Sequence, residues 1–298
     1  MAAWLVVGML GVGAVALGWG RVASGTSAGG RPLDASAFAA GACVAFAPTA
    51  GNRNETVFLD AGHGGIDPGG VGTTESGRII TEAAETLRVE LDATSLLRAD
   101  GFRVVVSRTT NSTVVRLRPT EVSGGELSLR GAHDDVAARD VCANLAKANV
   151  LVGIYFDASG APQTAGSLTA YDSARPFAPS DMRLASLLQR DVLNAMNARG
   201  WGIPDDGVLS DSGLGSSPGN PADGGLAAQS AAYDHLLLIG PAEAGYFSTP
   251  SEMAGAVIEP LYITDPFEGS IADSSAGQKV IAGGIAAAVE TFLRAPSG

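Results

Sequence analysis

The sequence is poor in cysteine, histidine and positive charge. Its 298 residues include two cysteines and three histidines, and 31 Asp and Glu outnumber 19 Lys and Arg, which gives a formal net charge of −12. General binding to nucleic acid needs Lys and Arg side chains that neutralise phosphates, so this charge balance argues against it. The sequence also has no internal repeat and no calcium-binding loop with ligands at regular odd positions.

Glycine and proline are abundant instead. The 40 Gly and 15 Pro together make up about 18% of the 298 residues, above a usual combined share of about 12%. This excess excludes a helical bundle and favours a fold rich in loops. Hydrophobic residues make up 46% of the sequence. That share is enough for one large core or two small ones, and it is not typical of a disordered chain.

The amino-terminal segment predicts export. Residues 2–20 contain no charged residue, and Arg21 ends the run. At about 1.5 Å per residue this length is sufficient to cross a bilayer, and the residues 22–24 (VAS) offer a cleavage site with small side chains. We therefore expect residues 1–24 to be either a signal peptide or a membrane anchor. A buried helix of the folded domain is the alternative.

Residues 25–54 are rich in Gly, Ala and Ser and are expected to form a linker, either without regular structure or with one strand within 37–47 lying on the domain. Cys43 falls in this linker, and Cys142 lies far along the chain. In an exported protein a disulfide between them is permitted. Alternatively, Cys142 is a small buried residue of a helix. The sequence leaves both alternatives open.

From residue 55 to residue 295 the pattern predicts a single α/β domain, with a mostly parallel central sheet flanked by helices. The acidic, Gly- and Pro-rich stretch at 201–224 is too long for an ordinary connection, so it is either a loop that borders a substrate groove or a plain excursion. The expected strands are 56–60, 102–107, 150–156, 166–171 and 236–239, and the expected helices are 82–100, 128–147, 180–199 and a last one that includes 281–292.

Three candidate site residues follow predicted strands or begin a predicted helix. His63 comes directly after the first strand in a Gly-rich loop, Glu82 opens the following helix, and Glu243 follows the strand at 236–239. Strand ends are where α/β domains build their sites. One imidazole and two carboxylates that converge there suit a divalent metal, and zinc in hydrolases takes three such ligands and a water.

The segment 60–69, DAGHGGIDPG, resembles the opening motif of the zinc-dependent N-acetylmuramoyl-L-alanine amidases with a type-3 catalytic domain. These proteins are bacterial cell-wall hydrolases. In that family the His of this motif and a Glu at the start of the following helix are zinc ligands. The resemblance therefore implies that His63 and Glu82 bind zinc.

Two further segments resemble the same family. The segment 243–250, EAGYFSTP, is similar to the closing element Glu-x-Gly-Phe-x-Ser-Asn-Pro, whose Glu is catalytic, and this implies that Glu243 is the catalytic residue. The segment 139–145, RDVCANL, resembles the Arg-containing helix that precedes the third motif. The resemblance as a whole covers the chain from about Thr56 to Leu293.

The third motif departs from the family pattern. In the family it reads Ser-x-His-Ala-Asn or Ser-x-His-Ala-Asp, and its His is the third zinc ligand. Here the strand reads GIYFD at 153–157, so Tyr155 stands in place of the His. A neutral phenol is a poor zinc ligand unless the metal deprotonates it. The open alternatives are coordination by Tyr155 or Asp157, a ligand from His133 or His235, or a site poor in metal.

The resemblance implies hydrolysis of the amide between the lactyl group of N-acetylmuramic acid and L-alanine in peptidoglycan. One Zn²⁺ ion would polarise the carbonyl and acidify a water, Glu243 would move the proton, and Asp157 is a candidate substrate-binding residue. The implied partner is peptidoglycan and not nucleic acid, with the membrane contacted only by an uncleaved amino-terminal segment. The implied location is exported, in the cell envelope, a periplasm-like space or the medium. The alternative is a pseudo-amidase that binds peptidoglycan or an envelope protein without turnover.

Overall fold

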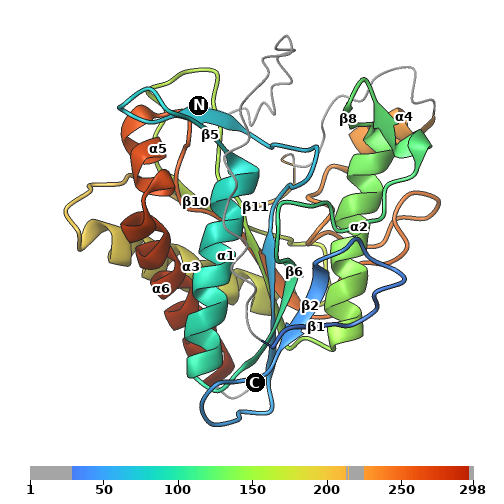
Figure 1. Cartoon of the computed structure of the whole chain (residues 1–298), viewed down its shortest axis with the longest axis horizontal. Coiled ribbons are helices and arrows are strands. Elements are labelled where there is room, and N and C mark those ends of the chain that lie inside the picture. Colours follow the sequence, from blue (N-terminus) through green and yellow to red (C-terminus); the bar gives the residue numbers. More distant parts are fainter. Residues whose placement is uncertain (1–28, 213, 215–224, 295–298) are drawn as a thin grey trace.

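A central sheet of eight strands runs through the computed structural model, which describes residues 29–212, 214 and 225–294 (Figure 1). The predicted signal peptide or anchor, residues 1–24, lies outside the described residues. The strand order is β1-β2-β6-β3-β9-β12-β10-β11. These strands are β1 (Arg31–Pro32), β2 (Ala42–Phe46), β3 (Thr56–Ala61), β6 (Arg103–Arg108), β9 (Val150–Ile154), β10 (Ser167–Tyr171), β11 (Asp205–Ser210) and β12 (Ala254–Glu259).

Most neighbouring strands in this sheet run parallel. Four of the seven pairs are parallel, namely β3 with β6, β3 with β9, β9 with β12, and β10 with β11. The pairs β1 with β2, β2 with β6, and β10 with β12 are antiparallel. The predicted α/β fold is confirmed. Because β10 and β11 run against β12, their carboxyl ends lie at the opposite edge of the sheet from those of β3, β9 and β12.

Helices cover both faces of the sheet (Figure 1). One face carries α1 (Glu82–Ala99), α3 (Ala178–Asn197), α5 (Pro266–Asp273) and α6 (Ser275–Arg294), and the other carries α2 (Leu129–Ala146) and α4 (Gly225–Tyr233). The smaller elements are the hairpins β4 (Val71–Thr73) with β5 (Ile79–Thr81) and β7 (Val122–Ser123) with β8 (Glu126–Leu127), and the 3-10 helix η1 (Pro119–Glu121). In the part of the chain that the structure describes, no helix has the length and apolar character to span a membrane.

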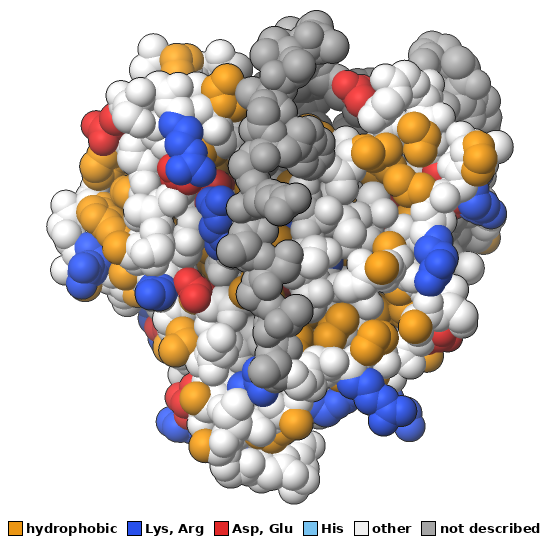
Figure 2. All heavy atoms as spheres, viewed as in Figure 1, with side chains coloured by type: hydrophobic (Ala, Val, Ile, Leu, Met, Phe, Trp, Pro, Cys, Tyr) orange, Lys and Arg blue, Asp and Glu red, His pale blue; other side chains and the backbone are white. Residues whose placement is uncertain are grey.

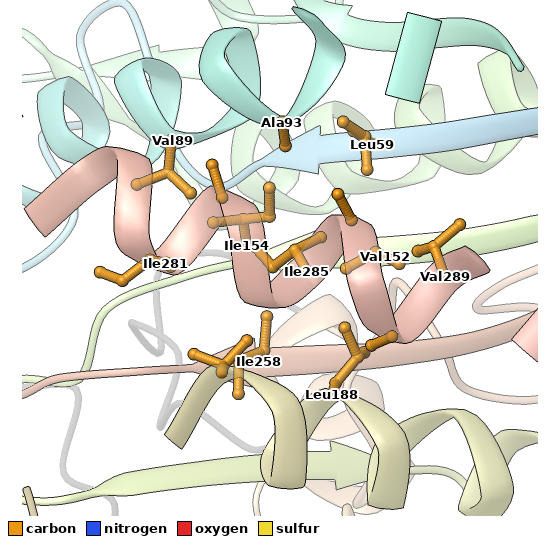
Figure 3. Close-up of a cluster of buried hydrophobic side chains, with 14 of the residues drawn as sticks. Leu59, Val89, Ala93, Val152, Ile154, Leu188, Ile258, Ile281, Ile285 and Val289 are labelled. Carbon is orange, nitrogen blue, oxygen red and sulfur yellow. The ribbon is translucent and has the colours of Figure 1, made fainter. Parts of the chain in front are cut away.

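Alternation along β3 divides its side chains between two cores. Val57 and Leu59 join the cluster beneath α1, α3 and α6, whereas Phe58 joins the cluster beneath α2. Figure 3 shows the larger cluster, in which helices direct side chains such as Leu188 and Ile285 towards the sheet. A strand that is buried on both faces has a continuous apolar sequence, and this is why residues 56–60 were recognisable as a strand.

The face of the molecule shown in Figure 2 carries its positive charges apart from one another. Figure 2 shows Lys and Arg side chains on this face in small separate groups, between polar and hydrophobic side chains. Attraction to a polyanion grows with the number of Lys and Arg that can contact it together, so the arrangement on this face provides little of it.

The predicted linker contributes two strands to the sheet. Both β1 and β2 fall within residues 25–54, and β2 pairs with β6, so regular structure begins before residue 55. Cys43 of β2 forms a disulfide with Cys142 of α2, and their Cα atoms are 5.7 Å apart. Of the two alternatives for Cys142, the disulfide is the one that the structure contains.

The prediction of a strand at 236–239 is wrong. These residues form turns, and Leu238 and Ile239 are buried in the cluster beneath α2. An apolar run alone does not distinguish a strand from a segment that packs on the face of a sheet. The central position is taken by β12, which begins with Ala-Gly-Ala and has little strand propensity there. In addition, β11 falls within 201–224, so part of that stretch is a strand.

The disulfide predicts a loss of stability on reduction. Cys43 and Cys142 are separated by 99 residues, and a cross-link over a loop of this length removes much entropy from the unfolded chain. We expect the double variant Cys43→Ala/Cys142→Ala to lower the free energy of unfolding by about 2–5 kcal/mol, measured by urea denaturation. A reductant should lower the stability of the wild type and leave that of the double variant unchanged. An unchanged midpoint for the reduced wild type would contradict the pairing.

Candidate functional site

Two buried arginines hold the turn that follows β3. His63 has a left-handed backbone with φ of 60°, which is uncommon for a residue other than glycine. The carbonyl oxygens of Ala61 and His63 accept hydrogen bonds from Arg139 at 2.7 and 2.8 Å, and the carbonyl oxygen of Gly62 accepts one from Arg108 at 3.0 Å. Three successive carbonyl groups are therefore fixed, and this fixes the direction in which the His63 side chain leaves the turn.

Arg139 is itself held by two carboxylates. Its Nη1 lies 2.6 Å from Asp60 Oδ1, and its Nη2 lies 2.8 Å from Asp135 Oδ2. All three side chains are buried. Burial by itself would lower the pKa of Arg139, but the charges of Asp60 and Asp135 outweigh it and raise that pKa well above the usual value. The guanidinium therefore stays charged beneath the turn.

The imidazole of His63 lies between two carboxylates. Nδ1 lies 2.8 Å from Asp67 Oδ2, and Nε2 lies 3.2 Å from Glu82 Oε2. Burial would lower the pKa of His63, but Glu82 and Asp67 outweigh it and raise the pKa to about 10. A carboxylate on one ring nitrogen is the arrangement that orients a metal-binding histidine through the other nitrogen, here Nε2.

Glu82 begins α1, and backbone groups position its carboxylate. Oε1 accepts a hydrogen bond from the N–H of Phe156 at 3.1 Å, and Oε2 accepts one from the N–H of Gly70 at 2.8 Å. Gly69 lies against both site side chains. A Cβ at this position would come within 2.6 Å of the His63 ring and 2.7 Å of Glu82 Oε2. The glycine loop at 68–70 therefore leaves the space that these two side chains occupy.

Tyr155 directs its hydroxyl away from the pair formed by His63 and Glu82. The hydroxyl donates to Asp60 Oδ2 at 3.2 Å, and the ring meets the His63 ring edge-on with centroids 5.5 Å apart. Burial raises the pKa of Tyr155 well above its usual value, and the charge of Asp60 adds to the effect. The phenol therefore keeps its proton. The ring fits because residue 62 is a glycine, where a Cβ would lie 2.5 Å from it.

Asp157 and Glu259 bring two further carboxyl groups to the same edge of the sheet. Asp157 follows β9, and Glu259 ends the neighbouring parallel strand β12. Asp157 Oδ2 and Glu259 Oε2 are buried atoms with no hydrogen-bond donor among the described residues. Burial raises the pKa of Asp157 to about 6. Burial also raises the pKa of Glu259 well above its usual value, and the charges of Asp157 and Glu82 add to this effect while His63 opposes it.

The structure thus brings together His63, Glu82, Asp157 and, through its ring, Tyr155, but it places Glu243 elsewhere. Glu243 lies in a tight turn closed by backbone hydrogen bonds with Phe247, and it is exposed. Within the described ranges, no hydrogen bond or ion pair joins its side chain to the other four. The sequence analysis did not single out Glu259. The signal that could have found it is a Glu at the carboxyl end of a buried strand.

The other two histidines, considered above as sources of the third ligand, also lie away from His63. His133 donates from Nε2 to the carbonyl of Tyr246 at 3.0 Å. His235 lies beside Asp172 and Asp211, and one donor atom from each of these three residues lies within 4.8 Å of the other two. Among the described residues, this is the group of three whose donor atoms come close enough together to hold a metal ion.

Several solved structures share the fold. An N-acetylmuramoyl-L-alanine amidase from Clostridium difficile 630 is 22% identical with a TM-score of 0.54, over 82% of this chain and 98% of that one. The catalytic domain of the amidase CwlV from Bacillus (Paenibacillus) polymyxa var. colistinus is 21% identical with a TM-score of 0.53, over 80% and 98%. The CwlD amidase from Clostridioides difficile, solved in complex with the GerS lipoprotein, is 17% identical with a TM-score of 0.56, over 80% and 98%.

A comparison with curated proteins gives no match. The model of the N-acetylmuramoyl-L-alanine amidase family, in contrast, matches residues 57–291. That match extends from the first residues of β3 to the last turns of α6, so it includes His63, Glu82, Asp157 and Glu259. The chain therefore belongs to the N-acetylmuramoyl-L-alanine amidase family.

Proposed function

We propose that this chain hydrolyses the amide between N-acetylmuramic acid and L-alanine with His63, Glu82 and Asp157 as ligands of one zinc ion and with Glu259 as the general base. Membership of the family makes the chain a hydrolase that acts on this bond of peptidoglycan. The observation that carries the assignment of residues is that the carboxyl groups of Asp157 and Glu259 lie together at the carboxyl ends of β9 and β12, close to Glu82 and His63.

The donor set fits zinc. Imidazole nitrogen and carboxylate oxygen are both ligands of zinc, and His63 is already oriented by Asp67 at 2.8 Å. Crowding and burial raise the pKa of Asp157 and of Glu259, and a cation between them and Glu82 would favour their ionised forms. When bound, zinc polarises a carbonyl and lowers the pKa of a water.

Tyr155 suits a supporting role better than that of a ligand. Its hydroxyl is bonded to Asp60, which in turn is paired with Arg139, so the phenol stabilises the ion pair beneath the His63 turn. Asp157 is two residues further along, and its carboxyl group interacts with that of Glu259 at the same site. We therefore assign the third ligand position to Asp157.

The chemical role assigned to the side chains of this protein is the transfer of one proton. Glu259 accepts a proton from the attacking water and donates it to the nitrogen of the leaving L-alanine as the C–N bond breaks. The products are a lactyl carboxylate on the sugar and a stem peptide with a free amino terminus. This cluster lies at the carboxyl ends of the neighbouring strands β9 and β12, with Asp157 buried and Glu259 half-buried.

The second candidate function is a pseudo-amidase that binds peptidoglycan or an envelope protein without turnover. The replacement of the family His by Tyr155, with its hydroxyl committed to Asp60, is the observation that favours it. The CwlD structure, which contains a lipoprotein, is one example of a relative in complex with a protein.

An extracytoplasmic location agrees with the family and with the disulfide, since disulfides persist in oxidising compartments. We further propose export through residues 1–24.

Replacing Glu259 by Gln tests the catalytic assignment against the one predicted from sequence. Purified full-length protein is incubated with peptidoglycan, and free stem peptides that begin with L-alanine are measured by mass spectrometry. Glu259→Gln should lower their rate of release by about 10²- to 10⁴-fold, the usual contribution of a general base, and Glu243→Gln should leave it unchanged. The opposite pattern would return the role to Glu243. Bound peptidoglycan without any product from the wild type would support the pseudo-amidase.

Single substitutions at Tyr155 and Asp157 separate the two candidates for the third ligand. Tyr155→Phe should retain bound zinc and lose about 1.5–3 kcal/mol of stability, because Asp60 loses a hydrogen bond. Asp157→Asn should lower the affinity for zinc at least tenfold. Tyr155→His, which restores the residue of the family, should raise that affinity. Loss of zinc in Tyr155→Phe would show that the phenol is the ligand.

A pair of glycines tests the space around His63 and Glu82. Gly69 and Gly77 both have positive φ, of 64° and 80°, so the backbone strain of an alanine should cost a similar amount of stability at either position, about 1–2 kcal/mol. Only at Gly69 would the Cβ meet His63 and Glu82; at Gly77 nothing lies within 4 Å. Gly69→Ala should therefore lose the zinc held by His63 and Glu82 and the amidase activity, whereas Gly77→Ala should retain both. Equal activities of the two variants would contradict the proposed site.

A further inference from the structure

The group formed by Asp172, Asp211 and His235 lies at the other edge of the sheet from His63. Asp172 directly follows β10 and Asp211 directly follows β11, and these parallel neighbours bring their carboxyl ends together. The N–H of Asp211 donates to the carbonyl oxygen of Tyr171 at 2.9 Å, which holds Asp211 beside Asp172, the residue that follows Tyr171. Because β10 is antiparallel to β12, this edge is opposite to the one where Glu259 lies. The two groups are therefore separate sites.

The three donor atoms have the spacing of a metal site. His235 Nδ1 lies 2.9 Å from Asp172 Oδ2 and 3.4 Å from Asp211 Oδ1. Tetrahedral zinc with nitrogen and oxygen ligands at about 2.0–2.2 Å keeps its ligand atoms about 3.3 Å apart. Small movements of these side chains are thus sufficient to accept an ion, and the donor set of one imidazole and two carboxylates suits a transition metal.

Backbone groups already orient both carboxylates. Asp172 Oδ1 accepts hydrogen bonds from the N–H groups of Ala174 and Arg175, each at 2.7 Å, and Asp211 Oδ2 accepts one from the N–H of Leu236 at 2.9 Å. The other oxygen of each aspartate is thereby turned towards His235. A site whose ligands are fixed in advance loses less conformational entropy when it binds an ion.

One oxygen in this group has no partner that satisfies it. Asp172 is completely buried, and its Oδ2 has no hydrogen-bond donor among the described residues. His235 Nδ1 lies 2.9 Å from this oxygen and 3.4 Å from Asp211 Oδ1, and a single N–H cannot satisfy both carboxylates. A buried carboxylate oxygen without a donor is costly, and a bound cation would remove that cost.

The surrounding charges do not balance the two aspartates. Both are completely buried, so even a protonated His235 leaves one negative charge. The guanidinium of Arg175 is directed elsewhere, since it donates to the carbonyl groups of Ile239, Ser251 and Met253. The buried negative charge therefore needs a counter-ion or a proton.

We infer that Asp172, Asp211 and His235 bind a divalent transition-metal ion, with zinc as the probe. Such an ion connects the ends of β10 and β11 to the segment after α4, where the Tyr233 ring also packs edge-on against His235 with centroids 5.4 Å apart. The imidazole is partly exposed, with 19% of its side chain accessible, which gives the ion a route of entry. The role of this site is to stabilise the fold at the edge remote from the hydrolytic site.

The test uses full-length protein in which the hydrolytic site is removed by His63→Ala/Glu82→Gln. After dialysis against a chelator, this variant is titrated with zinc alone, and bound zinc and the thermal midpoint are measured. We expect about one zinc per chain and a raised midpoint. Adding His235→Gln should abolish both effects, whereas adding His133→Gln, at the histidine that bonds to Tyr246, should change neither.

Two outcomes would overturn the inference. The first is absence of bound zinc in the His63→Ala/Glu82→Gln variant, which would leave the group as an ion pair. The second is retention of zinc after His235→Gln. Asp211→Asn provides a second variant that keeps an acceptor for the N–H of Leu236, and it should lower zinc affinity at least tenfold. Since His63 and Glu82 are absent throughout, none of these outcomes bears on the proposed amidase mechanism.

Discussion

The buried ion pair between Arg139 and Asp60 is the interaction on which the hydrolytic site depends. Arg139 reaches from α2 across the end of β3 and binds the carbonyl groups of Ala61 and His63 with the same guanidinium that pairs with Asp60. A buried charge that loses its partner is destabilising by about 3–5 kcal/mol. The pair therefore ties the position of His63 to the packing of α2 on the sheet, and a change in either disturbs the other.

The same ion pair explains how a tyrosine can stand where the family has a histidine. Asp60 has two oxygens, of which one pairs with Arg139 and the other accepts the hydroxyl of Tyr155. The phenol thus stabilises the support of the His63 turn. In the proposed site Asp157, two residues further along, takes the ligand position of the family His. This exchange needs no displacement of the strand β9.

Much of this architecture could be predicted from residues that act locally. His63 follows a continuous apolar strand, and Glu82 begins an amphipathic helix. These two patterns predicted both elements and indicated that the two side chains meet. Glu259 was missed because its strand begins with Ala-Gly-Ala, which has little strand propensity, so the Glu at the end of that strand did not stand out. A larger residue at Gly255 would be limited by Ile239 and Leu151, whose side chains lie 3.3 and 3.5 Å from where a Cβ would be. That limit comes from residues distant in sequence, as does the pairing of β2 with β6.

The two outermost strands of the sheet are poor templates for pairing with a strand of another molecule. β1 has only two residues, and one of them is Pro32, which has no N–H to donate. At the other end, β11 begins with the charged Asp205 and Asp206, and its pairing with β10 shifts register near this start. Short edges, prolines, charges and irregular register all oppose the addition of a foreign strand. The described sheet therefore resists edge-to-edge aggregation, which matters for a protein with a large apolar core.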